Sequence, residues 1–222
     1  MYSVVEFFLR HYSVFAIKNI SCLLYTSPSP RDRTRKRPFI WLSRFRYRCG
    51  YGVHSPFAFS LITDVIYEYT PYYAYHALQE EQRKKVRECG WSKSRGKINR
   101  FLFRLVNKVQ PATVIEVGQP STASLYLQSA KPSASYLFAS DLSELFLDAD
   151  TPVDFLYMNN YQNPELMEEV FHICAQRVTL KSVFVVQGIC YSKKMKTLWN
   201  QLKEDERVAV SYTHLTLPTN RE

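Results

Sequence analysis

The sequence lacks closely spaced cysteines. Its five cysteines are far apart in the chain: Cys22, Cys49, Cys89, Cys174 and Cys190. Without a C-x-x-C pair, the spacing argues against a zinc site and against a disulfide framework. We therefore expect a protein of a reducing, cytoplasmic environment.

The sequence also lacks an uninterrupted apolar run of membrane-spanning length. The first 24 residues are mostly apolar, but Arg10, His11 and Lys18 interrupt them. A basic start and a small-residue cleavage site, which mark a signal peptide, are missing too. We expect no membrane span, no signal peptide and no membrane partner.

Outside one short segment, the chain has little excess of either charge. Residues 31–48 hold eight Lys/Arg against one Asp and so carry +7 of the net charge of +9. Aromatic residues interleave with these cations, an arrangement that could stack on bases and neutralise phosphates. The same pattern also fits an N-terminal arm that docks its rings and leaves its arginines in solvent. We favour docking and keep an RNA-binding module as an alternative.

The stretch "CLLYTSPSPRD" at 22–32 has no apolar period, and "VSYTHLTLPT" at 210–219 mixes strand formers with no evident partner strand. Both can be read as translations, in two different frames, of the DNA element TGTCTCTTATACACATCT. Each stretch therefore resembles a translated sequencing adapter. On this interpretation residues 1–34 have no assigned fold and 210–222 are an adapter-like tail. We then expect the fold to be incomplete at the C-terminus.

Residues 35–96 combine the basic arm with an N-terminal helical region. Ser55 followed by Pro56 is typical of a helix start. An apolar stripe follows at helical spacing and ends before Pro71. Residues 80–97 are charged and poorly periodic, which indicates a solvated helix or loop.

Residues 97–209 alternate between apolar strands and helices, after an amphipathic helix over 98–109. The predicted strands are TVIEV at 113–117, SYLFAS at 135–140, VDFLYM at 153–158 and SVFVVQ at 182–187; the predicted helices span 121–130, 164–178 and 193–204. This order predicts an α/β fold with a Rossmann-like, mostly parallel sheet covered by helices on both faces. The segment 141–153 is too short for a helix and a further strand, so one crossover is predicted to be only a turn.

The stretch "VIEVGQPSTAS" at 114–124 has the order strand, turn, helix. Such a unit can begin a nucleotide-binding site, because glycine permits close backbone approach and a helix N-terminus presents free N–H groups. Here only one glycine, Gly118, follows the strand.

Residues 50–208 resemble the class I S-adenosylmethionine-dependent methyltransferases, in particular small O-methyltransferase-like members. "GYGVHSPFAF" matches a GxGxHSPFxF segment that precedes their sheet, and "VIEVG" matches the E-x-G end of their first strand. "DFLYMNN" stands in the place of their D-x-x-F-I-D-G strand. "SVFVVQGICYS" stands in the place of an apolar strand that ends in Asp-Asp or Asp-Asn.

The resemblance implies S-adenosylmethionine as the cofactor and a set of residues that bind it. Glu116 and Gly118 would line its methionine and ribose side, together with Ser121 and Asn159. Asp141 would bind the ribose hydroxyls, or would instead cap the helix that begins at "LSELF".

Several residues depart from the family pattern. Pro120 and Thr122 add bulk to the loop where the cofactor needs close backbone approach. Asn159, Gln187 and Gly188 replace the acids that hold a divalent cation in metal-dependent members. We therefore expect no metal.

Methyl transfer depends mostly on alignment, so an enzyme without a metal remains possible. His54 and Tyr191 are then the candidate bases. We interpret His172, which lies within a helical stripe, and Cys190, which follows a strand, as structural.

The leading hypothesis is a methyltransferase-like protein with an eroded cofactor and metal site. Its acceptor would be a small molecule or a group on a protein or RNA. The alternative is a non-catalytic Rossmann-like scaffold that serves in protein interaction or weak nucleotide binding.

Overall fold

The predicted strands form one sheet in the computed structural model, which describes residues 12–17, 56–68, 70–94, 96–148, 151–189, 191–205 and 207–209. Four strands are parallel: β2 (Thr113–Val117), β3 (Ser135–Ala139), β4 (Val153–Met158) and β5 (Val178–Gln187). With β1 (Tyr12–Ile17) and β6 (Val208–Ala209), the strand order is β3-β2-β4-β5-β1-β6. The sheet is mostly parallel, as predicted. β5 begins four residues earlier than expected, because Val178 already pairs with Val153.

Strand β1 lies in a segment for which the sequence predicted no element. It runs antiparallel between β5 and β6, with Tyr12 opposite Gln187 and Ile17 opposite Val208. The edge of β5 presents unpaired N–H and C=O groups along the apolar run 183–186, and such an edge readily accepts a strand. The composition "YSVFAI", rich in β-branched and aromatic residues, suits that position.

Most helices lie close to the predicted ranges, but the helix predicted over 164–178 ends three residues early, at Ala175, and the helix that holds the charged segment 80–97 begins six residues before it, at Ala74. They are α3 (Pro56–Leu61) with the π-helical turn η3 (Ile62–Ile66), α4 (Ala74–Cys89), α5 (Gly96–Val109), α6 (Ala123–Ala130), α7 (Pro164–Ala175) and α8 (Lys193–Glu204). Asn163 caps α7 by accepting from the Leu166 N–H at 3.2 Å, and Ser192 caps α8 by accepting from the Met195 N–H at 3.1 Å. Ser55 lies outside the described residues.

The connection from β3 to β4 contains only a single 3₁₀ turn, η4 (Leu142–Glu144), among its described residues. The prediction that one crossover is reduced to a turn is confirmed. The chain therefore passes from the edge strand β3 to β4 without a described helix between them.

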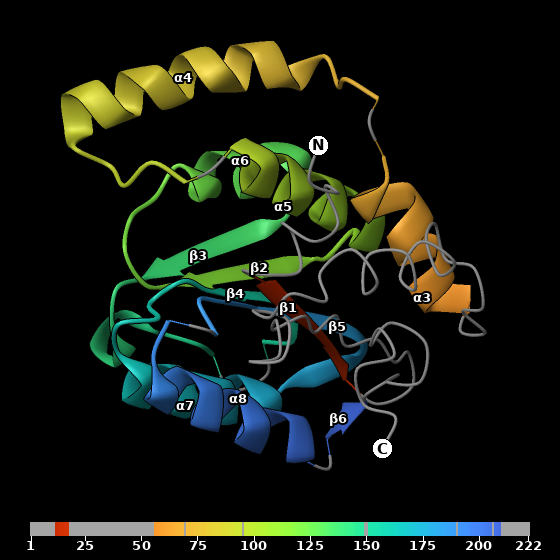
Figure 1. The fold of residues 1–222 in the computed structure, drawn as a ribbon, viewed down its shortest axis with the longest axis vertical. Helices are drawn as coiled ribbons and strands as arrows, with labels where there is room; N and C mark the ends of the chain where they lie inside the picture. Colours follow the sequence, from red (N-terminus) through yellow and green to blue (C-terminus); the bar gives the residue numbers. More distant parts are fainter. Residues whose placement is uncertain are drawn as a thin grey trace, which may run out of the picture.

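The strands alternate their side chains between two apolar layers. Figure 1 shows α5 and α6 on one face of the sheet and α7 and α8 on the opposite face. Toward α5 and α6 point Val114, Phe155, Tyr157, Val183 and Val185. Toward α7 and α8 point Ile115, Val117, Leu156, Met158, Phe184 and Val186. This arrangement confirms a Rossmann-like α/β fold covered on both faces.

Helix α4 is the outermost layer and rests on a small apolar cluster of its own (Figure 1). Its buried residues are Tyr75, Leu78 and Gln82, all in its first three turns. From Arg83 to Cys89 its side chains are mostly exposed. The charged segment is thus a solvated helix, which ends at Gly90 in a left-handed conformation with φ of 64°.

Within the described ranges, none of the helices combines the length and the apolarity that crossing a membrane requires.

Asp154 joins three segments at the amino end of the sheet. Its Oδ2 accepts from the N–H groups of Ala112 at 2.8 Å and Thr113 at 3.3 Å, and its Oδ1 accepts from the Thr179 hydroxyl at 3.0 Å. We expect Asp154→Ala to lower the free energy of unfolding by about 2 kcal/mol, because three partners lose a charged acceptor. Urea denaturation measures this loss.

The control is Asp64→Ala. Asp64 is exposed and binds the hydroxyl of the neighbouring Thr63 and the exposed Lys108, at 2.6 Å, so its loss should lower the free energy of unfolding by about 0.5 kcal/mol. Equal losses for the two variants would contradict the role given to Asp154.

Candidate functional site

The candidate site lies where the strand order reverses. From β2 the chain continues to β3 on one side, whereas β4 and β5 lie on the other. Ligands of open α/β sheets bind outside the carboxyl ends of the strands at such a point. We call the carboxyl ends of β2 and β4, with the loops 118–122 and 159–163, the switch point.

Gly118, directly after β2, adopts a backbone conformation that requires glycine. Its φ is 139°, and a Cβ at this position would lie 1.9 Å from Asn159 Oδ1 and 2.8 Å from the Asn160 nitrogen. Its N–H donates to the Ala139 carbonyl at 2.9 Å. The close approach that glycine permits is therefore used by another part of the same chain.

The Asn159 side chain spans this loop. Its Oδ1 accepts from the Gln119 N–H at 2.8 Å, and its Nδ2 donates to the Gln119 carbonyl at 3.1 Å and to Glu116 Oε1 at 3.1 Å. We call this side chain with its three hydrogen bonds the Asn159 bridge. It holds the loop after β2 against the end of β4.

Glu116 is a fully buried carboxyl group within β2. Besides the Asn159 bridge, it accepts a hydrogen bond at Oε2 from the Tyr136 hydroxyl at 2.5 Å. Burial raises the pKa of Glu116 to about 7, although hydrogen bonds from Tyr136 and Ser124 act in the opposite direction. Near neutral pH this carboxyl group is poised between its neutral and ionised forms.

The backbone donors of the loop are already paired inside the protein. The Thr122 N–H donates to the Ser92 carbonyl at 3.0 Å, and the Ala123 N–H donates to the Ser121 hydroxyl at 3.3 Å. The Ser124 N–H donates to the Ser121 carbonyl at 3.2 Å. With those of Gly118 and residue 119, five N–H groups of this turn have internal acceptors. A ligand at the switch point would find few free donors there.

Asp141, at the end of β3, caps its own turn. It is exposed, and its Oδ1 accepts from the backbone N–H of Ser143 at 2.8 Å and from the hydroxyl of Ser143 at 2.5 Å. These hydrogen bonds hold the pKa of Asp141 below its ordinary value. The structure therefore shows the contacts of the capping alternative, and the ribose alternative stays a prediction.

Of the two candidate bases, Tyr191 lies within the described residues. Tyr191 is 61% exposed after β5, and its ring lies against that of Tyr161. His172 lies exposed on α7, with its Nδ1 3.4 Å from an Arg207 nitrogen. His54 and Cys190 are outside the described residues.

Two of the three positions of the expected metal acids, Asn159 and Gln187, carry side-chain amides that bind other protein groups. The Tyr157 hydroxyl donates to Gln187 Oε1 at 2.5 Å, and Asn159 forms the bridge described above. Across the described part of the chain, no group of three or more His, Cys, Asp or Glu side chains is placed to hold a metal ion.

Sequence reasoning missed Tyr136 and Ser92. Tyr136 on β3 pairs with Val114 on β2. Glu116 lies two residues after Val114 on β2, so its side chain is on the same face of the sheet as Tyr136. Because side chains alternate between the two faces of a strand, this contact could have been predicted if the register of β2 and β3 had been known. The backbone pairing of Ser92 with Ser121 has no local sequence signal, because it joins an irregular segment to the loop.

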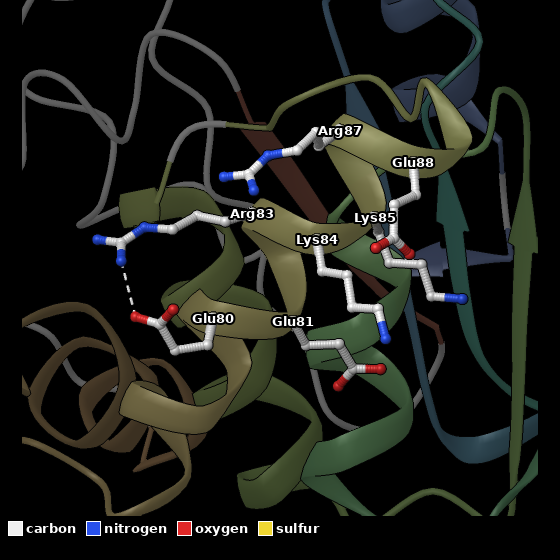
Figure 2. Close-up of a pocket in the computed structure, with 7 residues that line it drawn as sticks. All are labelled: Glu80, Glu81, Arg83, Lys84, Lys85, Arg87 and Glu88. Carbon is white, nitrogen blue, oxygen red and sulfur yellow. Dashed lines mark hydrogen bonds and ion pairs between the residues drawn. The ribbon is translucent and has the colours of Figure 1, made fainter.

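The described part of the surface has two hollows of note, and neither is lined by Gly118 or Asn159. One, of about 760 Å³, is bounded by charged side chains of α4 between Glu80 and Glu88, and Figure 2 shows that a single helix supplies them all. The other, of about 430 Å³, lies beside Tyr136 and Lys131. The first is therefore a hollow among surface side chains and does not resemble a catalytic cleft.

The chain matches no protein-family model, no curated protein and no solved structure.

Proposed function

We propose that this chain is a methyltransferase-like Rossmann scaffold whose switch point is closed by its own side chains, and that it acts in binding or interaction without transferring methyl groups. The observation that carries the proposal is the Asn159 bridge. It occupies the space next to Gly118 that a cofactor would need.

Opening the switch point has an energetic cost. A ligand must displace three hydrogen bonds of Asn159, each worth about 1 kcal/mol net. A cost of about 3 kcal/mol lowers affinity by roughly 100-fold. The N–H groups of the loop are already hydrogen-bonded within the protein. They would therefore form few new hydrogen bonds with a ligand to offset this cost.

Methyl transfer from S-adenosylmethionine is the second candidate function. Glu116, Gly118 and Asp141 are all placed at or near the carboxyl ends of parallel strands, where cofactors of this fold class bind. Their placement supports this candidate if the Asn159 side chain rotates away. The acceptor would then be a small molecule or a group on a macromolecule.

Calorimetric titration of the full chain with S-adenosylmethionine and with its demethylated product tests the proposal. We expect no saturable heat from the parent protein. Asn159→Ala removes the bridge and should give measurable binding if the bridge is the main obstacle. The control Asn163→Ala makes the same change at the α7 cap and should not.

Micromolar binding by the parent protein would contradict the closed switch point and favour the enzyme. If neither the parent nor Asn159→Ala binds, the proposed scaffold function stands. The obstacle to binding would then be the loop 118–122, whose N–H groups already have acceptors within the protein.

A further inference from the structure

Two tyrosine rings meet at the carboxyl edge of the sheet, one from the switch-point loop 159–163 and one from the loop after β5. Tyr161 follows β4 and Tyr191 follows β5, and their ring centroids are 4.7 Å apart with planes tilted by 58°. The contact belongs to two loops that are far apart in sequence. We call these residues the tyrosine pair.

The backbone after β5 is shaped around this pair. Gly188 has φ of 78°, and a Cβ there would lie 2.4 Å from Tyr161 Cβ and 2.5 Å from its Cγ. The Tyr191 N–H donates to the Gly188 carbonyl at 2.8 Å, which closes the turn. Any other residue at 188 would displace the Tyr161 ring, so the turn is matched to the pair.

The two rings differ in their surroundings. Tyr161 is half-buried and packs against the core beneath α7 and α8, whereas Tyr191 is 61% exposed. The inner ring therefore supports the outer one. A supported aromatic ring offers flat apolar area at a low cost in side-chain entropy, which suits stacking with another planar ring.

Two basic residues follow Tyr191 closely in the sequence. Lys193 and Lys194 begin α8 and are exposed, and Lys194 forms an ion pair of 2.7 Å with the exposed Glu165. A planar ligand that carries negative charge suits this setting better than a neutral or cationic one. Nucleotides combine a planar base with a phosphate, and base stacking on aromatic side chains tolerates any base.

We propose that the tyrosine pair binds a nucleobase, from a free nucleotide or from single-stranded nucleic acid, by stacking on Tyr191. The site is separate from the Asn159 bridge and needs no methyl transfer. If no nucleobase binds at Tyr191, the proposed function is therefore unaffected. If the switch point proves to bind S-adenosylmethionine, the proposal for the tyrosine pair is likewise unaffected.

The test is an NMR titration of the full chain with adenosine monophosphate, with ribose 5-phosphate as the probe that lacks a base. The base should shift the Tyr161 and Tyr191 signals, and ribose 5-phosphate should not. Tyr191→Leu should weaken binding by about 5-fold or more, and Tyr191→Phe should retain it. The control Tyr73→Ala removes a fully exposed tyrosine beside α4 and should have no effect.

Three results would overturn the proposal: equal shifts with both probes, equal losses in Tyr191→Leu and Tyr73→Ala, or shifts centred on the Gly118 amide. A second arm with a short oligoadenylate identifies the source of the base. If the oligoadenylate binds more tightly than adenosine monophosphate and its binding weakens with salt, the ligand is single-stranded nucleic acid. If the two bind with equal affinity, the ligand is a free nucleotide.

Discussion

Gly118→Ala should lower the free energy of unfolding by about 4 kcal/mol. The new Cβ would overlap Asn159 Oδ1, and a residue with a side chain must adopt a backbone conformation that is strained for it. The Asn160 nitrogen, at 2.8 Å, belongs to the backbone and cannot move aside cheaply. Chemical denaturation of the two proteins measures the difference.

Gly96→Ala is the matched control, because a Cβ at that position meets no atom within 4 Å. Its effect should stay within about 0.5 kcal/mol. The double variant Gly118→Ala with Asn159→Ala should recover at least about 1 kcal/mol relative to the sum of the two single changes. Additive losses would show that Asn159 is not what occupies the space at Gly118.

The free energy of unfolding should fall by about 3 kcal/mol as the pH rises from 4.5 to 7, through the contribution of Glu116 alone. In the folded protein the pKa of this buried carboxyl is raised to about 7 from an ordinary value of 4.5. Between these values the folded state holds a proton that the unfolded state has released, so raising the pH favours unfolding. Well above pH 7 both states are ionised and the contribution stays constant.

Glu116→Gln isolates this contribution, because other groups titrate equally in both proteins. The difference in unfolding free energy between parent and variant should change with pH in the stated range and become flat well above pH 7. Tyr136→Phe removes a hydrogen bond that lowers the pKa of Glu116, so the fall should extend to higher pH. A parent and a Glu116→Gln variant with parallel pH profiles would contradict the assignment.

The elements of the domain could be predicted because their signals are local. The strands TVIEV and VDFLYM and the helix 193–204 occupy the predicted residues, since apolar runs and capping side chains act within a few positions. Asn163 and Ser192 cap their helices as expected. The short connection after β3 was also readable, since its length alone excludes a longer structure.

The chemistry at the switch point could not be predicted to the same depth. The sequence indicated that Glu116, Gly118 and Asn159 lie at strand ends, but not that Asn159 would bond across the loop. Hydrogen-bond partners depend on register and on side-chain rotamers, which no periodicity encodes. Strand β1 was missed for a related reason, because its place is set by the open edge of β5 rather than by its own pattern.

The position of β1 also determines how the last strand is held. Among the described strands, β6 pairs only with β1, so every sheet hydrogen bond of Val208 and Ala209 depends on a strand from the opposite end of the chain. Local opening of β1 therefore releases β6 as well, and the two strands form one cooperative opening unit. The slowly exchanging amides of the sheet should then end at β5, and β6 can be protected no better than β1.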